Sequence, residues 1–366
     1  MSKIRVIDLF AGAGGLSVGA CLADLDVAAS VELDPLACDT LDMNSKYHGK
    51  VVRADICGLS GWELRQQAGV KKRDPLIVVG GPPCQPFSKA AYWTEEGKEA
   101  EFRRRRAKGH KVERPPAPTS VRPDARRSLV DEFWRVVEEA DADGFLFENV
   151  PSIKHPRNVV VYRQLLDRAI AAGYELTEIT ANAVDYGVAQ TRQRVVVLGS
   201  KRKRPELPNP THSVLDPSDS GLLPAVTAGE ALEGLDQDEY FEPEEIVRGR
   251  WAEHLKEIPP GWNYKALTAW AGHPEPSFEA ETRFWNFLLK LSPTRPSWTI
   301  AASPGPWTGP FHWTTRRLRT IEMAALQGFP RGYSFAGSRR DRVRQIGNAV
   351  PPPMARALIS AVAHTI

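Results

Sequence analysis

A cysteine held in a stiff loop is the most reactive candidate in the sequence. Cys84 lies in the run Gly-Gly-Pro-Pro-Cys-Gln-Pro-Phe-Ser at 80–88, directly after the apolar stretch 76–79. That stretch is expected to be a buried parallel strand, so the cysteine would follow the strand's carboxyl end. A lone cysteine is usually an inert core residue, but three nearby prolines stiffen this loop, which can then present a thiolate. We therefore predict that Cys84 is a nucleophile.

An acidic residue and two arginines are expected near this cysteine. Glu148 and Asn149 follow the apolar run 144–147, whose carboxyl end would lie at the same sheet edge as Cys84. A carboxyl group whose pKa is raised by burial can donate a proton to a ring nitrogen. Arg192 and Arg194 are two residues apart, so they are expected on one side of a strand, where they could hold Glu148 or a phosphate. Taken singly, these groups are more often structural ion pairs.

A glycine-rich turn and two acids predict a nucleoside site. The turn Asp-Leu-Phe-Ala-Gly-Ala-Gly-Gly ends at Gly15, after the first predicted strand and before a helix. Glycines there let the backbone approach a ligand closely at a helix N-terminus. Glu32 and Asp55 end the second and third predicted strands, and a carboxylate at the second can bind ribose hydroxyls. The alternative is a tight turn with incidental acids.

The elements that would position these residues alternate between strands and helices. Apolar runs predict strands at 4–9, 27–31, 51–52, 76–79, 144–147 and 195–198, and helical periodicity appears at 16–23, 128–140 and 159–172. This alternation predicts an α/β fold with a doubly wound, mostly parallel sheet, whose chemistry lies at the carboxyl ends of the strands.

The alternation is lost after residue 200, so we expect a second, smaller domain at 201–315 between a catalytic domain at 1–200 and a returning segment at 316–366. Residues 205–313 are rich in proline and glycine and hold seven of the ten tryptophans, which we expect mostly in that domain's core. A long polar loop at about 85–127 interrupts the first domain. This loop and residues 311–366 are basic whereas 201–310 are acidic, a pattern that attracts a polyanion or simply marks a solvated surface.

Several protein classes are excluded. No apolar run reaches the roughly 20 residues of a membrane span, and the N-terminus lacks a signal-peptide layout. The four cysteines form no CxxC pair, so we expect neither a metal site nor a disulfide framework. A reducing, cytoplasmic location is expected.

Seven motifs in order resemble the cytosine-C5 DNA methyltransferase family of bacterial restriction-modification systems. They are FAGAGG, ELD, PPCQPFS, ENV, QTRQR, LQGFP and QIGNAVPP, and they cover about residues 1–200 and 295–366. The resemblance implies a Rossmann-like methyltransferase fold. The same resemblance implies an enzyme that uses S-adenosylmethionine as cofactor and releases S-adenosylhomocysteine. It also implies double-stranded DNA as substrate and target recognition by residues 201–315. We further expect a monomer in the bacterial cytoplasm near the nucleoid, associated in function with a cognate restriction endonuclease.

The resemblance also implies a mechanism and assigns residues to it. The target cytosine is flipped out of the duplex, Cys84 adds to its C6, and Glu148 stabilises or protonates N3. Asn149 would fix Glu148, while Arg194, with Arg192 nearby, would reach Glu148 or the cytosine edge.

Cofactor and DNA contacts follow from the same resemblance. The cofactor residues would be Phe10, Gly12, Ala13, Gly15, Glu32, Leu33, Asp55, Ile56, Pro83, Leu129, Asn348 and Val350. Leu33 departs from the family, which often has an aromatic residue there, so stacking on the adenine would be weaker. The loop after Ser88 is also unusually long and basic. Candidate DNA contacts are Gln85, Ser88, Arg103, Arg104, Arg105, Arg106, Arg126 and Arg127, although charged runs are often only solvated faces.

Two other functions compete with this one. A small branch of the family methylates tRNA, but the sizeable variable region after QTRQR favours duplex DNA. A catalytically inactive DNA-binding regulator could share the fold, but the presence of Cys84, Glu148 and the glycine-rich turn argues against it.

Overall fold

A seven-stranded sheet forms the centre of the computed structural model. The model describes residues 3–83, 101–102, 105, 110, 112–113, 125–156, 158–215 and 221–366. The strands of the sheet are β1 (Arg5–Leu9), β2 (Asp26–Glu32), β3 (Lys50–Arg53), β4 (Leu76–Gly80), β5 (Gly144–Asn149), β6 (Glu175–Asn182) and β8 (Gln193–Ser200). Their order is β3-β2-β1-β4-β5-β8-β6, in which the first five are parallel and β8 runs antiparallel to β5 and β6. The prediction of a mostly parallel α/β sheet is therefore confirmed.

The central strands are continuous apolar runs because both faces of the sheet are covered. Every residue of β4 and β5 is buried, as parallel strands between two helical layers require. Strand β6 was not predicted, because it lies at the sheet edge and its residues alternate between exposed and covered positions.

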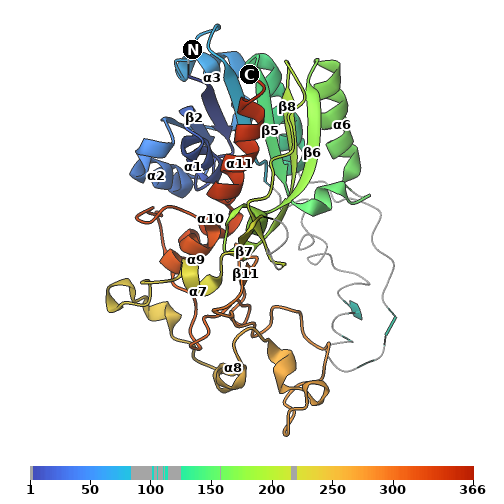
Figure 1. The fold of residues 1–366 in the computed structure, drawn as a ribbon, viewed down its shortest axis with the longest axis vertical. Helices are drawn as coiled ribbons and strands as arrows, with labels where there is room; N and C mark the ends of the chain where they lie inside the picture. The colour runs from blue at the N-terminus through green and yellow to red at the C-terminus, as the bar shows by residue number, and fades with distance from the viewer. Residues whose placement is uncertain are drawn as a thin grey trace.

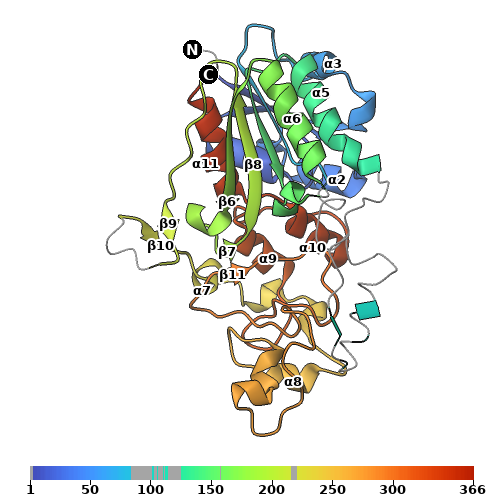
Figure 2. The same cartoon turned by 90° about the vertical axis from the view of Figure 1, so that its right-hand side faces the viewer.

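Helices cover the two faces of the sheet in separate layers. The helices are α1 (Gly15–Leu22), α2 (Pro35–Met43), α3 (Gly61–Gln67), α5 (Leu129–Glu139), α6 (Val159–Ala171), α7 (Ala228–Ala231), α8 (Ala252–Glu257), α9 (Thr320–Gln327), α10 (Arg339–Asn348) and α11 (Pro352–Ala363). Helices α3, α5 and α6 lie on one face and α1 and α11 on the other (Figures 1 and 2). No helix in the described ranges is both long enough and apolar enough to cross a membrane.

Aromatic side chains fill the core beneath α5. Phe133 and Trp134 are adjacent on the buried face of this helix, and they pack edge-to-face on Phe147 and Phe145 of β5 at ring distances of 5.4 and 5.7 Å. Edge-to-face pairs of this kind add about 1 kcal/mol each to the burial of their apolar area. The sheet edge that carries the candidate site is therefore built on a rigid layer.

From the end of β8 the chain runs back along the sheet, and residues 212–215 and 221–319 then lie below the carboxyl ends of the parallel strands (Figures 1 and 2). The strands described there are two residues long: β9 (His212–Ser213) pairs with β10 (Leu223–Pro224), and β11 (Ser297–Trp298) pairs with β7 (Gln190–Thr191). One apolar cluster belongs to this region alone and is formed by Leu255, Ile258, Tyr264, Leu267, Phe278, Phe287, Leu288 and Phe311. A second cluster joins the region to α9 and α10.

The expectation that the tryptophans lie mostly in the core of this region is met only in part. Trp262, Trp270 and Trp285 are 47%, 68% and 57% exposed, and the other four tryptophans of the region are half-buried. Of these four, Trp251 and Trp307 pack on the first apolar cluster, and Trp298 and Trp313 pack on the second.

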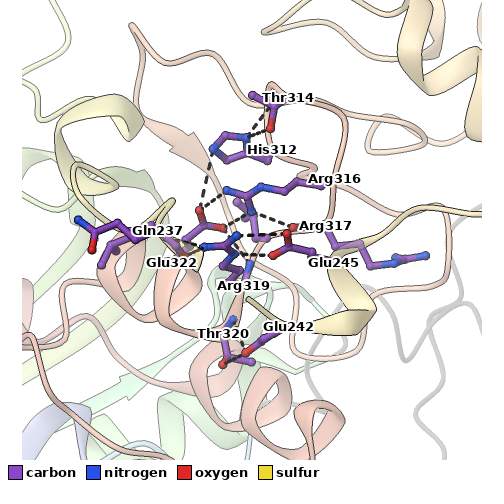
Figure 3. Close-up of polar contacts among 12 residues, drawn as sticks. Gln237, Glu242, Glu245, His312, Thr314, Arg316, Arg317, Arg319, Thr320 and Glu322 are labelled. Carbon is purple, nitrogen blue, oxygen red and sulfur yellow. Dashed lines mark hydrogen bonds and ion pairs between the residues drawn. The ribbon is translucent and has the colours of Figure 1, made fainter. Parts of the chain in front are cut away.

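A buried network of charges ties residues 235–245 to the start of α9 (Figure 3). The Arg319 guanidinium pairs with both carboxylate oxygens of Glu245 and donates to the Leu235 and Gln237 carbonyl oxygens. On the first turn of α9, Glu322 accepts two hydrogen bonds from Arg316, at 2.6 and 2.8 Å. These charges are desolvated but paired.

We expect Arg319→Met to lower the free energy of unfolding by about 3–5 kcal/mol, because Glu245 would remain buried without its partner. Chemical denaturation monitored by circular dichroism measures this change. Lys256→Met is the matched control, because its pair with Glu253 is exposed and should contribute about 1 kcal/mol or less. Equal losses in the two variants would show that the buried network does not stabilise this region.

Candidate active site

The chemistry-bearing residues gather at the carboxyl ends of four neighbouring strands. The glycine-rich turn follows β1, Glu32 ends β2, Pro82 and Pro83 follow β4, and Glu148 lies near the end of β5. Because β2, β1, β4 and β5 are adjacent in the sheet, these four segments lie side by side. Ligands of doubly wound folds bind at this edge.

Glu148 forms a buried ion pair with Arg194. Its Oε1 lies 2.7 Å from Nε of Arg194, which extends from β8, the antiparallel neighbour of β5. Burial raises the pKa of Glu148, while the positive charges of Arg194 and Arg192 lower it. Because burial has the larger effect, this carboxyl group takes up a proton more readily than an exposed glutamate.

The chain that leads to Cys84 packs directly on this pair. The Asn149 side chain donates to the Pro82 carbonyl oxygen at 3.2 Å. A Cβ added to Gly81 would lie 2.8 Å from Oε2 of Glu148, so any larger residue there would displace the carboxylate. Pro83 is the last described residue of this run, and Cys84, Gln85 and Ser88 lie outside the described residues. The backbone is thus fixed against Glu148 up to the residue before the cysteine.

Arg192 does not share a strand with Arg194, so the expectation of two arginines on one side of a strand was wrong. Arg192 lies between β7, which ends at Thr191, and β8, which begins at Gln193, and belongs to neither strand. The Arg192 side chain is buried and donates to the carbonyl oxygens of Gly347 and Ile300, at 2.7 and 3.4 Å. Through these two hydrogen bonds the Arg192 side chain connects the segment between β7 and β8 to Gly347 of α10 and to Ile300.

The glycine-rich turn binds the acid at the end of β2. Gly12 donates its N–H to Oε2 of Glu32 at 2.8 Å, and Leu33 and Asp34 donate theirs to Oε1. A carboxylate has about four acceptor positions, so these three bonds leave capacity for a hydroxyl group. Phe10 begins the turn in the left-handed region (φ 57°), which a phenylalanine rarely adopts outside functional sites.

The other predicted cofactor residues lie around this turn. Leu33 is 63% exposed beside Glu32, Asp55 caps a short helix by accepting from the Cys57 N–H at 3.0 Å, and Ile56 is buried. Leu129 is the first residue of α5. Asn348 is the exposed last residue of α10, and the Val350 carbonyl oxygen lies directly against Gly15. The exposed apolar side chain of Leu33 and the free acceptor positions of Glu32 lie side by side, and together they suit the base and the ribose of a nucleoside.

Asp8 is a buried acid of this turn that sequence reasoning passed over, although a charged residue inside an apolar strand is a visible signal. Its Oδ2 accepts the Ser17 N–H at 3.1 Å, while Oδ1 has no hydrogen-bond partner among the described residues. Burial, the largest influence, raises the pKa of Asp8 from 3.8 to about 7.

The raised pKa of Asp8 predicts a pH-dependent stability. Between pH 4 and 7 the folded state holds a proton that the unfolded state releases, so stability from this group falls as the pH rises. The contribution of Asp8 to the free energy of unfolding falls by up to about 4 kcal/mol between pH values below 4 and above 7. We expect Asp8→Asn, measured by urea denaturation at pH 4.5 and 8, to gain stability relative to wild type at the higher pH. The exposed control Asp24→Asn should show no such gain, and a parallel response of both variants would contradict the assignment.

Few of the candidate DNA-contact residues fall in described parts of the chain. Arg105 is exposed, and Arg127 donates to Oδ1 of Asn158 at 2.9 Å. Arg126 lies in a short helix at Ala125–Ser128, but its side chain, like Arg103, Arg104 and Arg106, lies outside the described residues.

Comparison with known proteins identifies similar chains. The family model for C-5 cytosine-specific DNA methylases matches residues 4–107 and 120–364. Type II methyltransferase M.SacI of Streptomyces achromogenes is 35% identical, with 98% of this chain and 93% of that protein covered. Type II methyltransferase M.XorII of Xanthomonas oryzae is 32% identical, covering 98% and 84%. Among solved structures, an E. coli prophage chain assigned as a DNA modification methyltransferase has a TM-score of 0.68 at 22% identity, covering 99% of both chains.

Proposed function

We propose that Cys84 and Glu148 carry out the reaction of this protein, which belongs to the family of C-5 cytosine-specific DNA methylases. Members of this family are DNA cytosine methyltransferases, and so is this chain. The observation that supports this most is the packing of Gly81–Pro83 against the buried Glu148–Arg194 pair. This packing makes Cys84 the first residue after a backbone that is already fixed beside the acid. A nucleophile and a proton donor at one sheet edge suit addition to a ring that carries a basic nitrogen.

We propose that the cofactor is S-adenosylmethionine, which supplies an electrophilic methyl group when bound. Glu32 would accept a ribose hydroxyl, Leu33 and Ile56 would contact the adenine, and Phe10 to Gly15 would surround the amino-acid end. Pro83 and Leu129 would line the site, Asp55 would reach the adenine edge, and Asn348 and Val350 would close it from the C-terminal segment. The spare acceptor capacity of Glu32 and the exposure of Leu33 support this assignment.

The protein's residues would act in a fixed order on a cytosine flipped out of the duplex. The Cys84 thiolate forms a bond to C6 while Glu148 donates a proton to N3, so negative charge does not accumulate on the ring. C5 then takes the methyl group. Transfer of the C5 proton to water would then expel Cys84 as a thiolate, and N3 would return its proton to Glu148, which restores the aromatic ring. Arg194 holds the Glu148 carboxylate at 2.7 Å, and Asn149 holds the backbone of the cysteine loop.

The remaining regions would select and hold the DNA. Residues 201–315 would form the target-recognition domain beside a catalytic domain at 1–200, to which 316–366 return. Gln85, Ser88 and the basic residues of 85–127 would contact the duplex. The enzyme would act as a monomer in restriction-modification, protecting DNA from a cognate endonuclease; the similarity to Type II methyltransferases supports this role.

Methyl transfer to two nucleic acids tests the proposal. Purified protein is incubated with methyl-labelled S-adenosylmethionine and either unmethylated plasmid DNA or unmodified tRNA, and label in each polymer is counted. We expect label in DNA only. Label in tRNA only would instead identify a tRNA methyltransferase.

Covalent trapping separates an enzyme from an inactive regulator. Duplex DNA synthesised with 5-fluorocytosine in place of cytosine is incubated with the protein and S-adenosylmethionine. After methyl transfer, C5 of the adduct carries fluorine and no hydrogen, so Cys84 cannot be expelled and the adduct should migrate as a denaturation-resistant complex. DNA binding without label or trapping would favour the regulator.

A further inference from the structure

A buried hydrogen-bond chain runs beneath the glycine-rich turn and ends on its backbone. Oγ of Ser17 lies 2.8 Å from Nδ1 of His48, and Nε2 of the same ring lies 2.8 Å from the Tyr333 hydroxyl. The Tyr333 hydroxyl donates to the Ala13 carbonyl oxygen at 2.6 Å. Residues more than 300 positions apart in sequence thus meet under one turn, and neither His48 nor Tyr333 belongs to the motifs that identified the site.

The direction of each proton in this chain follows from the groups themselves. A carbonyl oxygen can only accept, so the Tyr333 hydroxyl uses its single proton on Ala13 and must accept from Nε2–H of His48. Burial lowers the pKa of His48 to about 4, so the ring is neutral at physiological pH. Its Nδ1 therefore accepts, and the Ser17 hydroxyl donates its proton to this nitrogen at 2.8 Å rather than to the more distant Gly14 carbonyl oxygen at 3.2 Å.

The chain locks the peptide that bends the turn. Tyr333 holds the Ala13 carbonyl oxygen, and the N–H of the same peptide, on Gly14, donates to the Ala11 carbonyl oxygen at 2.8 Å. Gly14 has a φ of 78°, and a Cβ there would lie 2.2 Å from Cε1 of His48, so the imidazole ring packs directly against the turn. With this peptide fixed, the neighbouring Gly12 N–H stays aimed at Glu32.

Tyr333 is itself held in place by α2. The Ser334 N–H and carbonyl oxygen both bond to the Asn44 side chain, at 3.1 and 2.7 Å. Ala336 donates to Oγ1 of Thr40 at 2.9 Å. The hydroxyl therefore reaches Ala13 from a rigid support.

We propose that His48 and Tyr333 are positioning residues that hold the turn at 10–15 in its cofactor-binding shape through this hydrogen-bond chain. The proposal rests on the assignment of that turn to S-adenosylmethionine. Neither side chain need touch the cofactor; loss of the chain would loosen the turn and reduce cofactor affinity while leaving the reacting groups intact.

The matched pair Tyr333→Phe and Tyr174→Phe tests this. Both remove a tyrosine hydroxyl that donates to a carbonyl oxygen at 2.6 Å, but Tyr174 bonds to Ala142, in the core beside β5 and α5. Binding of S-adenosylhomocysteine to each full-length protein is measured by isothermal titration calorimetry, and melting temperatures are measured without ligand. We expect Tyr333→Phe to raise the dissociation constant about fivefold to tenfold, because one hydrogen bond that holds the turn is lost. We expect Tyr174→Phe to leave the dissociation constant unchanged.

Histidine variants extend the test. His48→Gln keeps a donor near the position of Nε2 and should retain most of the affinity, whereas His48→Leu should match Tyr333→Phe.

In steady-state assays the variants that bind the cofactor weakly should show a raised KM for S-adenosylmethionine with kcat nearly unchanged. Wild-type affinity in Tyr333→Phe, or an equal loss in Tyr174→Phe, would overturn the proposal. Failure of the wild type itself to bind S-adenosylhomocysteine would instead contradict the cofactor assignment.

Discussion

Replacing Cys84 by serine is expected to lower kcat by about four orders of magnitude or more, because a serine hydroxyl is almost never ionised near neutral pH and cannot replace a thiolate at C6. The structure places the backbone of Gly81 and Pro82 against Glu148 and Asn149, and the substitution changes one atom of a side chain that follows this segment. Binding of DNA and S-adenosylhomocysteine should be unchanged.

Single-turnover methyl transfer and trapping by 5-fluorocytosine DNA measure this effect. Cys57→Ser is the matched control, because Cys57 is exposed in the short helix after β3 and takes no part in the proposed reaction. Trapping by the Cys84 variant would show that another residue forms the covalent bond.

Replacing Glu148 by glutamine is expected to reduce kcat by about 10²–10⁴-fold, the usual contribution of a general acid. Glutamine keeps the size of the side chain but cannot deliver a proton to N3. In the wild type, activity should fall as the pH rises through the pKa of Glu148, which burial raises, since the protonated form is lost. The glutamine variant should lack this alkaline decline.

Arg194 provides an independent check of the same group. Its positive charge lowers the pKa of Glu148, so Arg194→Met should move the alkaline decline of kcat to higher pH. Arg194→Lys preserves the charge and should leave the decline nearly in place. An unchanged pH profile in both Glu148→Gln and Arg194→Met would assign the titration to a different residue.

Local sequence was sufficient to predict the sheet edge that carries the site. Apolar runs followed by glycine, proline or an acid marked β1, β2, β4 and β5, because strands buried on both faces must be apolar and their polar residues must lie at the ends. Glu148 and Glu32 could be found in this way.

Contacts between distant segments could not be predicted. Arg192 was expected beside Arg194, but the break between β7 and β8 turns it toward Gly347. His48 and Tyr333 carry no local signal, since their roles arise only when α2 and the segment after α9 meet. The exposure of Trp262, Trp270 and Trp285 shows the same limit, because no local signal separates them from the tryptophans that pack on the apolar clusters.

The packing of α11 beside α1 has a consequence for how the protein is made. Met354, Leu358 and Val362 of α11 cover the sheet face that also carries Leu16 and Ala20. About 150 residues separate this helix from β8, the last strand of the sheet to be made. At ribosomal speeds of about 5–20 residues per second, part of that face stays uncovered for roughly 8–30 seconds. During translation the nascent chain therefore presents a broad apolar surface to chaperones, and methylation must wait until α11 has emerged.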